Sequence, residues 1–171
     1  LLLGNRKIPK ALMVKDRQAY SDYKKYALQN IEILSDLHED DYVLDKMTSM
    51  AWTNGYFPVY NNCLLTYFPS GEEQYQAFIQ ELIKAEDFIF MEFFIINKGV
   101  MWNTILQILM DKAAMGVDVR VIYDDMGCLT YLPRDYAKCL NACGIQTHAF
   151  NPLRPQLAMA MNNRDHRKIL V

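Results

Sequence analysis

The chain has 171 residues, of which 51% are hydrophobic, seven are Gly and six are Pro. This composition excludes a disordered or fibrous protein, and the length suffices for one domain with a hydrophobic core plus an extension. The formal net charge of −2 conceals an asymmetry along the chain. Residues 1–30 carry seven Lys and Arg against two Asp and Glu, whereas residues 31–60 carry one Lys against six acids.

Residues 1–58 are predicted to form a helical juxtamembrane extension. Residues 1–4, Leu-Leu-Leu-Gly, lack an initiator Met and are followed by a cluster of cations, which is typical of the cytoplasmic end of a transmembrane helix. Three leucines fall far short of the roughly 20 apolar residues that cross a bilayer, so a frayed terminus is the alternative. The basic arm would lie against anionic lipid, or else it is a solvated helix face.

Apolar spacing predicts helices over about 10–30 and 42–53, with an acidic break at 36–41 between them. From residue 59 onward the pattern indicates a mostly parallel α/β sheet flanked by helices, with right-handed crossovers. A capping box at Ser70-Gly71-Glu72-Glu73 opens a helix that runs to Lys84. The strands are predicted over 64–68, 88–96, 117–125 and 145–150 and at the His166 segment, and the later helices over 100–115 and 133–143.

Two features of the α/β part bear on burial. The run Phe88–Ile96 is apolar except for one acid, which is typical of a strand covered on both faces of a sheet. The cysteines show neither a CxxC pair nor zinc-ligand spacing, so they are interpreted as buried, reduced thiols; they are Cys63, Cys128, Cys139 and Cys143.

The chemistry-bearing residues gather near the end of the chain. His166 and Lys168 are two apart at the start of an apolar run, which places an imidazole and an ammonium on the same side of a strand. One group can attack phosphorus or transfer a proton while the other neutralises phosphate oxygens, so the pair suits a phosphodiester. An isolated His-x-Lys is weak evidence, and a solvated strand edge would also explain it.

Two acids are candidates for the same site. Glu92 stands alone in the apolar run, and an unpaired buried carboxylate is costly. It either pairs with an arginine or lines the site, bonded to the histidine or to substrate. Asp124, followed by Asp125, ends a strand, and ligands collect at the carboxyl ends of parallel strands.

Four segments closely resemble bacterial cardiolipin synthases of the phospholipase D superfamily. They are YFPSGEE at 67–73, MEFFI at 91–95, GVDVRVIYD at 116–124 and NRDHRKILV at 163–171. The last resembles the first half of the superfamily motif His-x-Lys-x-x-x-x-Asp. Order and spacing agree over about residues 60–171, so we expect 59–171 to be the first catalytic half, cut inside its motif.

The resemblance implies a site and a reaction. His166, Lys168, Glu92 and Asp124 would be catalytic or supporting residues, and Asn163 and Arg167 would bind substrate. Two His-x-Lys pairs would meet, the second from the other half of the same chain, and pass a phosphatidyl group from one phosphatidylglycerol to another through a phosphohistidine. No metal or organic cofactor and no nucleic acid would take part.

The resemblance also implies a place and leaves alternatives open. The enzyme would be anchored in the bacterial cell membrane with its catalytic part on the cytoplasmic side, and the 171-residue chain alone would be inert. Another superfamily phosphodiesterase, such as a nuclease completed by homodimerisation, is the second hypothesis. A non-enzymatic binding module is the third. The near balance of charge over residues 61–171 favours neither nucleic acid nor a basic site surface.

Overall fold

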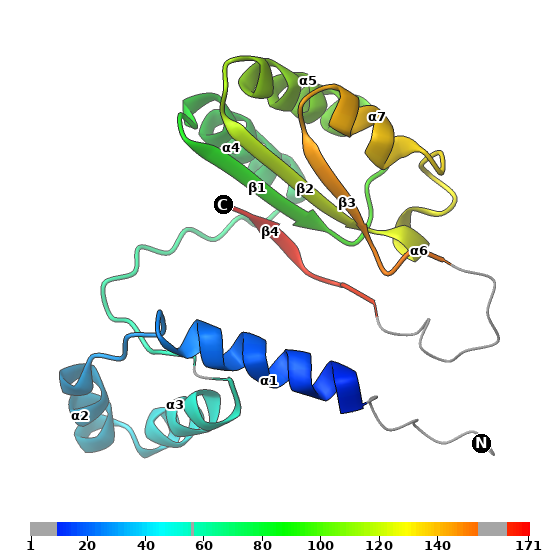
Figure 1. The fold of residues 1–171 in the computed structure, drawn as a ribbon. Coiled ribbons are helices and arrows are strands. Elements are labelled where there is room, and N and C mark those ends of the chain that lie inside the picture. Colours follow the sequence, from blue (N-terminus) through cyan, green and yellow to red (C-terminus); the bar gives the residue numbers. More distant parts are fainter. Residues whose placement is uncertain (1–9, 56, 154–163) are drawn as a thin grey trace. The chain divides into compact units, whose positions relative to one another are not determined.

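The computed structural model describes residues 10–55, 57–153 and 164–171 (Figure 1). The chain divides into two compact units between Thr66 and Tyr67. The predicted boundary at residues 58–59 stays a prediction. Residues 1–4, on which the predicted end of a transmembrane segment falls, lie outside the described residues. Within the described ranges, no helix combines the length and the hydropathy needed to cross a bilayer.

The first unit is helical and contains α1 (Lys10–Lys24), α2 (Ile31–Asp40) and α3 (Tyr42–Gly55). The predicted acidic break at 36–41 is wrong, because most of it lies inside α2. Asn30 caps α2 by accepting a hydrogen bond from the Glu32 amide at 2.9 Å. Asp41 then accepts from the amides of Val43 and Leu44 at 2.8 and 3.0 Å and opens α3. Only Asp41 therefore separates the two helices, and it serves as the N-cap of α3, a position that Asp favours.

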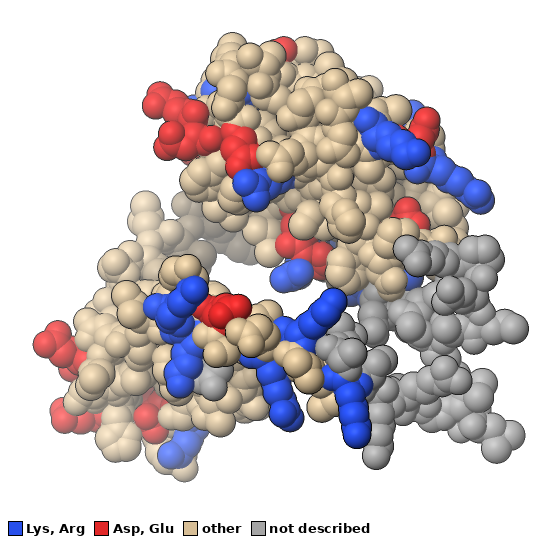
Figure 2. Space-filling model, viewed as in Figure 1, with Lys and Arg blue, Asp and Glu red and all other residues tan. Residues whose placement is uncertain are grey.

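Charge is segregated within this unit. Figure 2 shows Lys and Arg side chains along α1 and acidic side chains over α2. The predicted helix over 10–30 is shorter than expected, because α1 ends at Lys24 and Asn30 already caps the next helix.

The second unit is an α/β domain, which confirms the predicted fold class. Its sheet has the order β3-β2-β1-β4, with β1, β2 and β3 parallel and β4 antiparallel to β1. The strands are β1 (Phe88–Phe93), β2 (Asp118–Asp124), β3 (Gln146–Phe150) and β4 (Lys168–Leu170), and the helices are α4 (Gly71–Lys84), α5 (Val100–Ala114), α6 (Asp125–Cys128) and α7 (Tyr136–Ala142). The single antiparallel strand, β4, agrees with the expected mostly parallel sheet.

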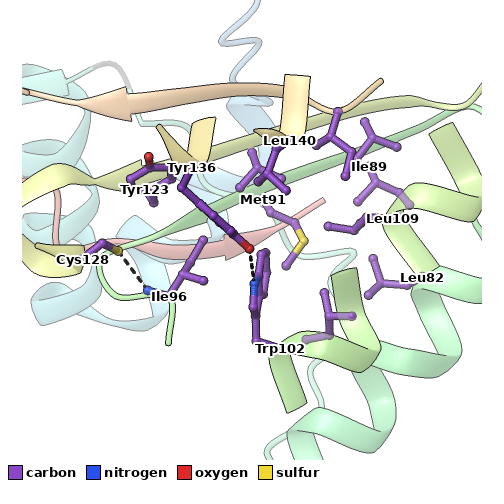
Figure 3. Packing of buried hydrophobic residues seen from close by; sticks show 14 residues of the cluster. Leu82, Ile89, Met91, Ile96, Trp102, Leu109, Tyr123, Cys128, Tyr136 and Leu140 are labelled. Atoms are coloured by element: carbon purple, nitrogen blue, oxygen red, sulfur yellow. Dashed lines mark hydrogen bonds between the residues drawn. The ribbon is translucent and has the colours of Figure 1, made fainter. Parts of the chain in front are cut away.

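The core lies between one face of the sheet and helices α4, α5 and α7 (Figure 3). Alternate residues of β1 and β2, such as Ile89, Met91 and Val121, are buried on this face. Leu109 of α5 is fully buried against the same cluster. Period-two burial on the strands thus meets the apolar stripes of the helices, as expected for two packed layers.

The opposite face of the sheet is open in the described part of the chain. Phe88 of β1 is 45% exposed and Ile122 of β2 is 37% exposed. The prediction that residues 88–96 are covered on both faces is therefore wrong for this structure. The strand is also shorter, because β1 ends at Phe93. A continuous apolar run records which residues can be buried, whereas coverage depends on which elements lie over each face.

Residues 64–68 were predicted to form a strand, and this is wrong. The segment carries no ladder hydrogen bonds, and Leu64 and Leu65 are 99% and 90% exposed. Apolar and aromatic composition favours extended backbone, but a strand also needs a neighbour to pair with. The capping box beside it is confirmed on one side, because the Ser70 hydroxyl accepts from the Glu73 amide at 3.2 Å.

The Ser70 cap provides a stability test. Ser70→Ala removes the acceptor for the Glu73 amide, so we expect the free energy of unfolding to fall by about 1 kcal/mol. Urea unfolding measures this change. Ser70→Asp is the matched control, because Asp is an equally good N-cap, and it is expected to retain wild-type stability. Equal losses in both variants would contradict the capping role.

Candidate active site at the carboxyl edge of the sheet

The candidate site forms where β1 and β2 end and β4 begins. Because β4 runs antiparallel to β1, its first residue, Lys168, is the register partner of Phe93, the last residue of β1. The preceding residues, 164–167, pass the carboxyl ends of β1 and β2. The structure therefore brings Glu92, Asp124, Arg167 and the His-Lys pair into one region. Asn163 lies outside the described residues, so its predicted role stays a prediction.

His166 and Lys168 contact each other directly. Lys168 Nζ lies 3.0 Å from His166 Nδ1 and donates to the His166 carbonyl oxygen at 2.7 Å. The ammonium group is a donor, and which ring nitrogen of His166 carries a proton depends on the tautomer. Both side chains are exposed. The pair thus presents an imidazole and an ammonium group to solvent at the edge of the sheet.

The Phe94 ring packs against both members of the pair. Its ring centroid lies 4.7 Å from that of His166, and Lys168 Nζ lies 5.6 Å from the Phe94 centroid. A ring face attracts a cation within about 6 Å, so Phe94 both packs the imidazole and holds the ammonium. In the sequence, Phe94 belongs to the apolar run 88–96, and nothing in that local pattern assigns it to the site.

Asp124 anchors the segment that carries the pair. Its side chain is fully buried, at 0% exposure, and accepts three hydrogen bonds. The donors are the Gly127 amide at 2.9 Å, Arg164 Nη1 at 3.3 Å and the Asp165 amide at 3.1 Å. A buried carboxylate is tolerated when it is paired and hydrogen-bonded in this way. Its observed contacts are those of a positioning residue, and a direct catalytic role for Asp124 stays a prediction.

Glu92 pairs with an arginine, which was one of the two alternatives for it. Arg167 Nη2 lies 2.6 Å from Glu92 Oε1, within ion-pair distance. Arg167 Nε also donates to Asp165 Oδ1 at 3.1 Å. Arg167 is thereby held between two carboxyls. Its predicted role in binding substrate remains a prediction.

The two carboxyls divide their protons unequally. Burial raises the pKa of Glu92, and the neighbouring Asp165 raises it further. Burial also opposes ionisation of Asp165, but its hydrogen bonds with Glu92 and Arg167 outweigh this and lower its pKa. Two close carboxyls separate in this manner because both cannot ionise freely. Of the two carboxyls that contact the Arg167 guanidinium, Asp165 is therefore the more readily ionised.

Residues of α6 fix the chain after β1. The Ile96 amide donates to Cys128 Sγ at 3.1 Å, and a Cβ on Gly127 would collide with the Phe94 carbonyl oxygen. The spacing Asp-x-x-Gly at 124–127 is the sequence signal from which α6 could be predicted, because Asp at the end of a strand suits the N-cap of a following helix.

The prediction that all the cysteines are buried is wrong, because Cys63, Cys139 and Cys143 are exposed and only Cys128 is buried.

The described residues contain no group of three or more His, Cys, Asp or Glu arranged to hold a metal ion. The arrangement offers instead a hydrogen-bond donor, a nearby fixed cation and a buried polar support. These groups can bind an anion and transfer a proton to or from it. The α/β sheet with a His-x-Lys segment at its edge is consistent with a phospholipase D-like half-domain.

Comparison with known proteins relates the chain to cardiolipin synthases. It is 43% identical over 162 residues to an uncharacterized protein of Streptococcus mutans, covering 95% of this chain and 34% of that protein. It is 35% identical over 123 residues to the cardiolipin synthases of Geobacillus thermodenitrificans and Staphylococcus aureus, covering 71% of this chain and 24% of each enzyme. The chain thus spans about a third or a quarter of these relatives. No protein-family model and no solved structure matches it.

The Asp124 anchor predicts a large stability effect. Asp124→Ala leaves Arg164 without its buried carboxylate partner, and breaking a buried pair costs about 3–5 kcal/mol. We expect the free energy of unfolding to fall by that order in urea titrations. The matched control is Asp118→Ala, which breaks the exposed pair with Arg120 and should change stability little. Similar losses in the two variants would contradict the anchoring role.

The raised pKa of Glu92 predicts a pH dependence. The folded chain binds more protons at this site than the unfolded chain, so the contribution of Glu92 to stability is full below its ordinary pKa of 4.5 and is lost as pH rises toward the native value. Glu92→Gln mimics the protonated form at every pH. We compare the free energy of unfolding of the variant with that of wild type at each pH. We expect this difference to favour the variant more at about pH 7 than at about pH 4. Urea unfolding at both pH values measures this, and an unchanged difference would contradict the shift.

Proposed function

We propose that this chain supplies one of the two His-Lys pairs of a cardiolipin synthase, which transfers a phosphatidyl group between two phosphatidylglycerol molecules. The contact of 3.0 Å between His166 and Lys168 carries the proposal, because it brings together the proton-transfer group and the cation that phosphoryl chemistry needs. The sequence relationship to cardiolipin synthases supports the choice of reaction.

The proposed reaction has two displacements at one phosphorus. A histidine attacks the phosphorus of the first phosphatidylglycerol and forms a phosphohistidine, while the second histidine protonates the departing glycerol oxygen. That second histidine then removes a proton from the glycerol hydroxyl of another phosphatidylglycerol, whose oxygen displaces the histidine. The products are cardiolipin and glycerol. The two lysines neutralise the charge that develops on the nonbridging oxygens.

His166 fits either position in this scheme. As the acid it would donate a proton from its imidazolium form and then act as the base in its neutral form. As the nucleophile it would attack phosphorus through an unprotonated ring nitrogen.

The second pair is proposed to come from another half-domain of the same polypeptide. The sequence contains a single His-x-Lys, at 166–168, so a site with two pairs must be completed by further residues. Anionic phospholipid is the proposed partner, and the cations along α1 suit a position against the cytoplasmic surface of a bacterial cell membrane. The scheme uses no metal or organic cofactor and no nucleic acid.

The test is the formation of cardiolipin and glycerol from phosphatidylglycerol by the purified full-length gene product. We expect His166→Ala to lower the rate by about 10²–10⁴-fold, the usual contribution of a proton-transfer group. Lys168→Ala should lower it by about 10²–10³-fold. His148→Ala and Lys138→Ala are matched controls, because both residues are exposed on other elements, and they should retain wild-type rates.

The 171-residue chain by itself is expected to form no cardiolipin, because it holds one pair. Rapid transfer by this chain alone would contradict the two-pair scheme. Cleavage of DNA or another phosphodiester by a dimer of the protein, without lipid transfer, would favour the alternative superfamily phosphodiesterase.

A further inference from the structure

An apolar cavity of about 300 Å³ opens beside the candidate site. It lies between the first turns of α4 and α5 and the end of β1. Its walls include Tyr75 and Phe78 of α4, Met91 and Phe93 of β1, and Trp102 and Ile105 of α5. None of the described residues that line the cavity is charged. The lining side chains with polar groups are Gln74, Asn97, Tyr75 and Trp102. Its volume is at the lower end of that of small-molecule sites.

The cavity adjoins the His-Lys pair through two consecutive residues. Phe93 lines the cavity and is the register partner of Lys168, and paired residues project from the same face of a sheet. The next residue, Phe94, contacts the His166 ring, and Ile95 lines the cavity again. The pair itself does not line the cavity, but Phe93, which pairs with Lys168, forms part of its wall, so a phosphate bound by the pair would lie near the cavity.

The lining selects the class of ligand. A sugar, glycerol or nucleobase would lose water from several polar groups and find few partners here, which is costly. A hydrocarbon chain has no hydrogen bonds to water to lose, and burying its apolar surface is favourable. At about 30 Å³ for each water-sized group, the cavity holds about ten such groups, which is a segment of one acyl chain and not two chains.

We propose that this cavity binds part of one acyl chain of the phospholipid whose phosphate contacts His166 and Lys168. The proposal rests on the proposed function, since it takes a phospholipid as the substrate. The cavity then fixes the lipid at a point close to its phosphate and aligns the phosphorus with the imidazole. Partly exposed Ile95 and Met101, each 46% exposed, form an apolar rim through which a chain can enter.

Two glycines give a matched pair of variants. Gly71 lines the cavity, and a Cβ built on it meets no atom within 4 Å, so Gly71→Phe can fill the cavity from its rim. Gly99, which precedes α5, is equally open but does not line the cavity, so Gly99→Phe is the control. Met101→Trp is a second blocking variant at the exposed rim.

Binding is measured with phosphatidylglycerol that carries a photoreactive diazirine in one acyl chain, added to the full-length gene product bearing His166→Ala to prevent turnover. We expect cross-links to peptides within residues 71–105. Gly71→Phe and Met101→Trp should lower the yield of these cross-links at least tenfold, and Gly99→Phe should not. Labelling outside the cavity, or equal loss in Gly71→Phe and Gly99→Phe, would overturn the proposal.

The cardiolipin assay separates this proposal from the proposed function. In the otherwise wild-type enzyme, Gly71→Phe is expected to lower kcat/KM for phosphatidylglycerol at least tenfold, and Gly99→Phe to leave it unchanged. Cardiolipin formation with labelling elsewhere would refute the cavity and leave the function standing. Cavity labelling without any cardiolipin would refute the function and leave the cavity standing. Absence of both would refute both.

Discussion

A buried carboxylate at the end of β2 is the constraint on which the site depends. Asp124 is removed from water, and its charge is compensated by the guanidinium of Arg164 and by the amides of Gly127 and Asp165. Two of these donors belong to the segment just before His166, about forty residues away in sequence. The cost of burying a charge is thus offset only when the distant segment is in place. Folding of the sheet edge and assembly of the site become one event.

The consequence is an exposed His-Lys pair on a buried support. β4 is only three residues long and lies at the edge of the sheet, so its ladder alone would fix His166 and Lys168 weakly. Further contacts hold the segment: Asp165 and Glu92 contact the Arg167 guanidinium, and Phe94 packs against the imidazole. Phosphoryl chemistry gains from groups held in place before substrate arrives, since no reorganisation is then required during the reaction.

Much of the architecture could be predicted from local patterns. The Ser70 cap and the alternation of apolar strands with amphipathic helices follow from residues close in sequence, and the α/β class follows from them. The predictions that failed needed tertiary information. Residues 64–68 have a strand-like composition but no partner strand, and residues 88–96 are apolar while one face of β1 stays open. Pattern shows what can be buried, and packing decides what is.

The site shows the same division. His166 and Lys168 could be selected from their spacing, and Glu92 from its apolar surroundings. The anchoring contacts of Asp124 could not, because its partners are forty and forty-one residues away along the chain. The same holds for Phe94, which follows β1 and contacts the ring of His166, just before β4.

Amide hydrogen exchange tests this account most directly. In the full-length gene product, exchange within residues 164–171 is compared between wild type and Asp124→Asn, which keeps the side-chain volume and removes the charge. We expect this segment to exchange slowly in wild type and much faster in the variant, while β2 and β3 keep their protection. Unchanged protection of residues 164–171 would contradict it, because the His-Lys segment would then be held in place without Asp124.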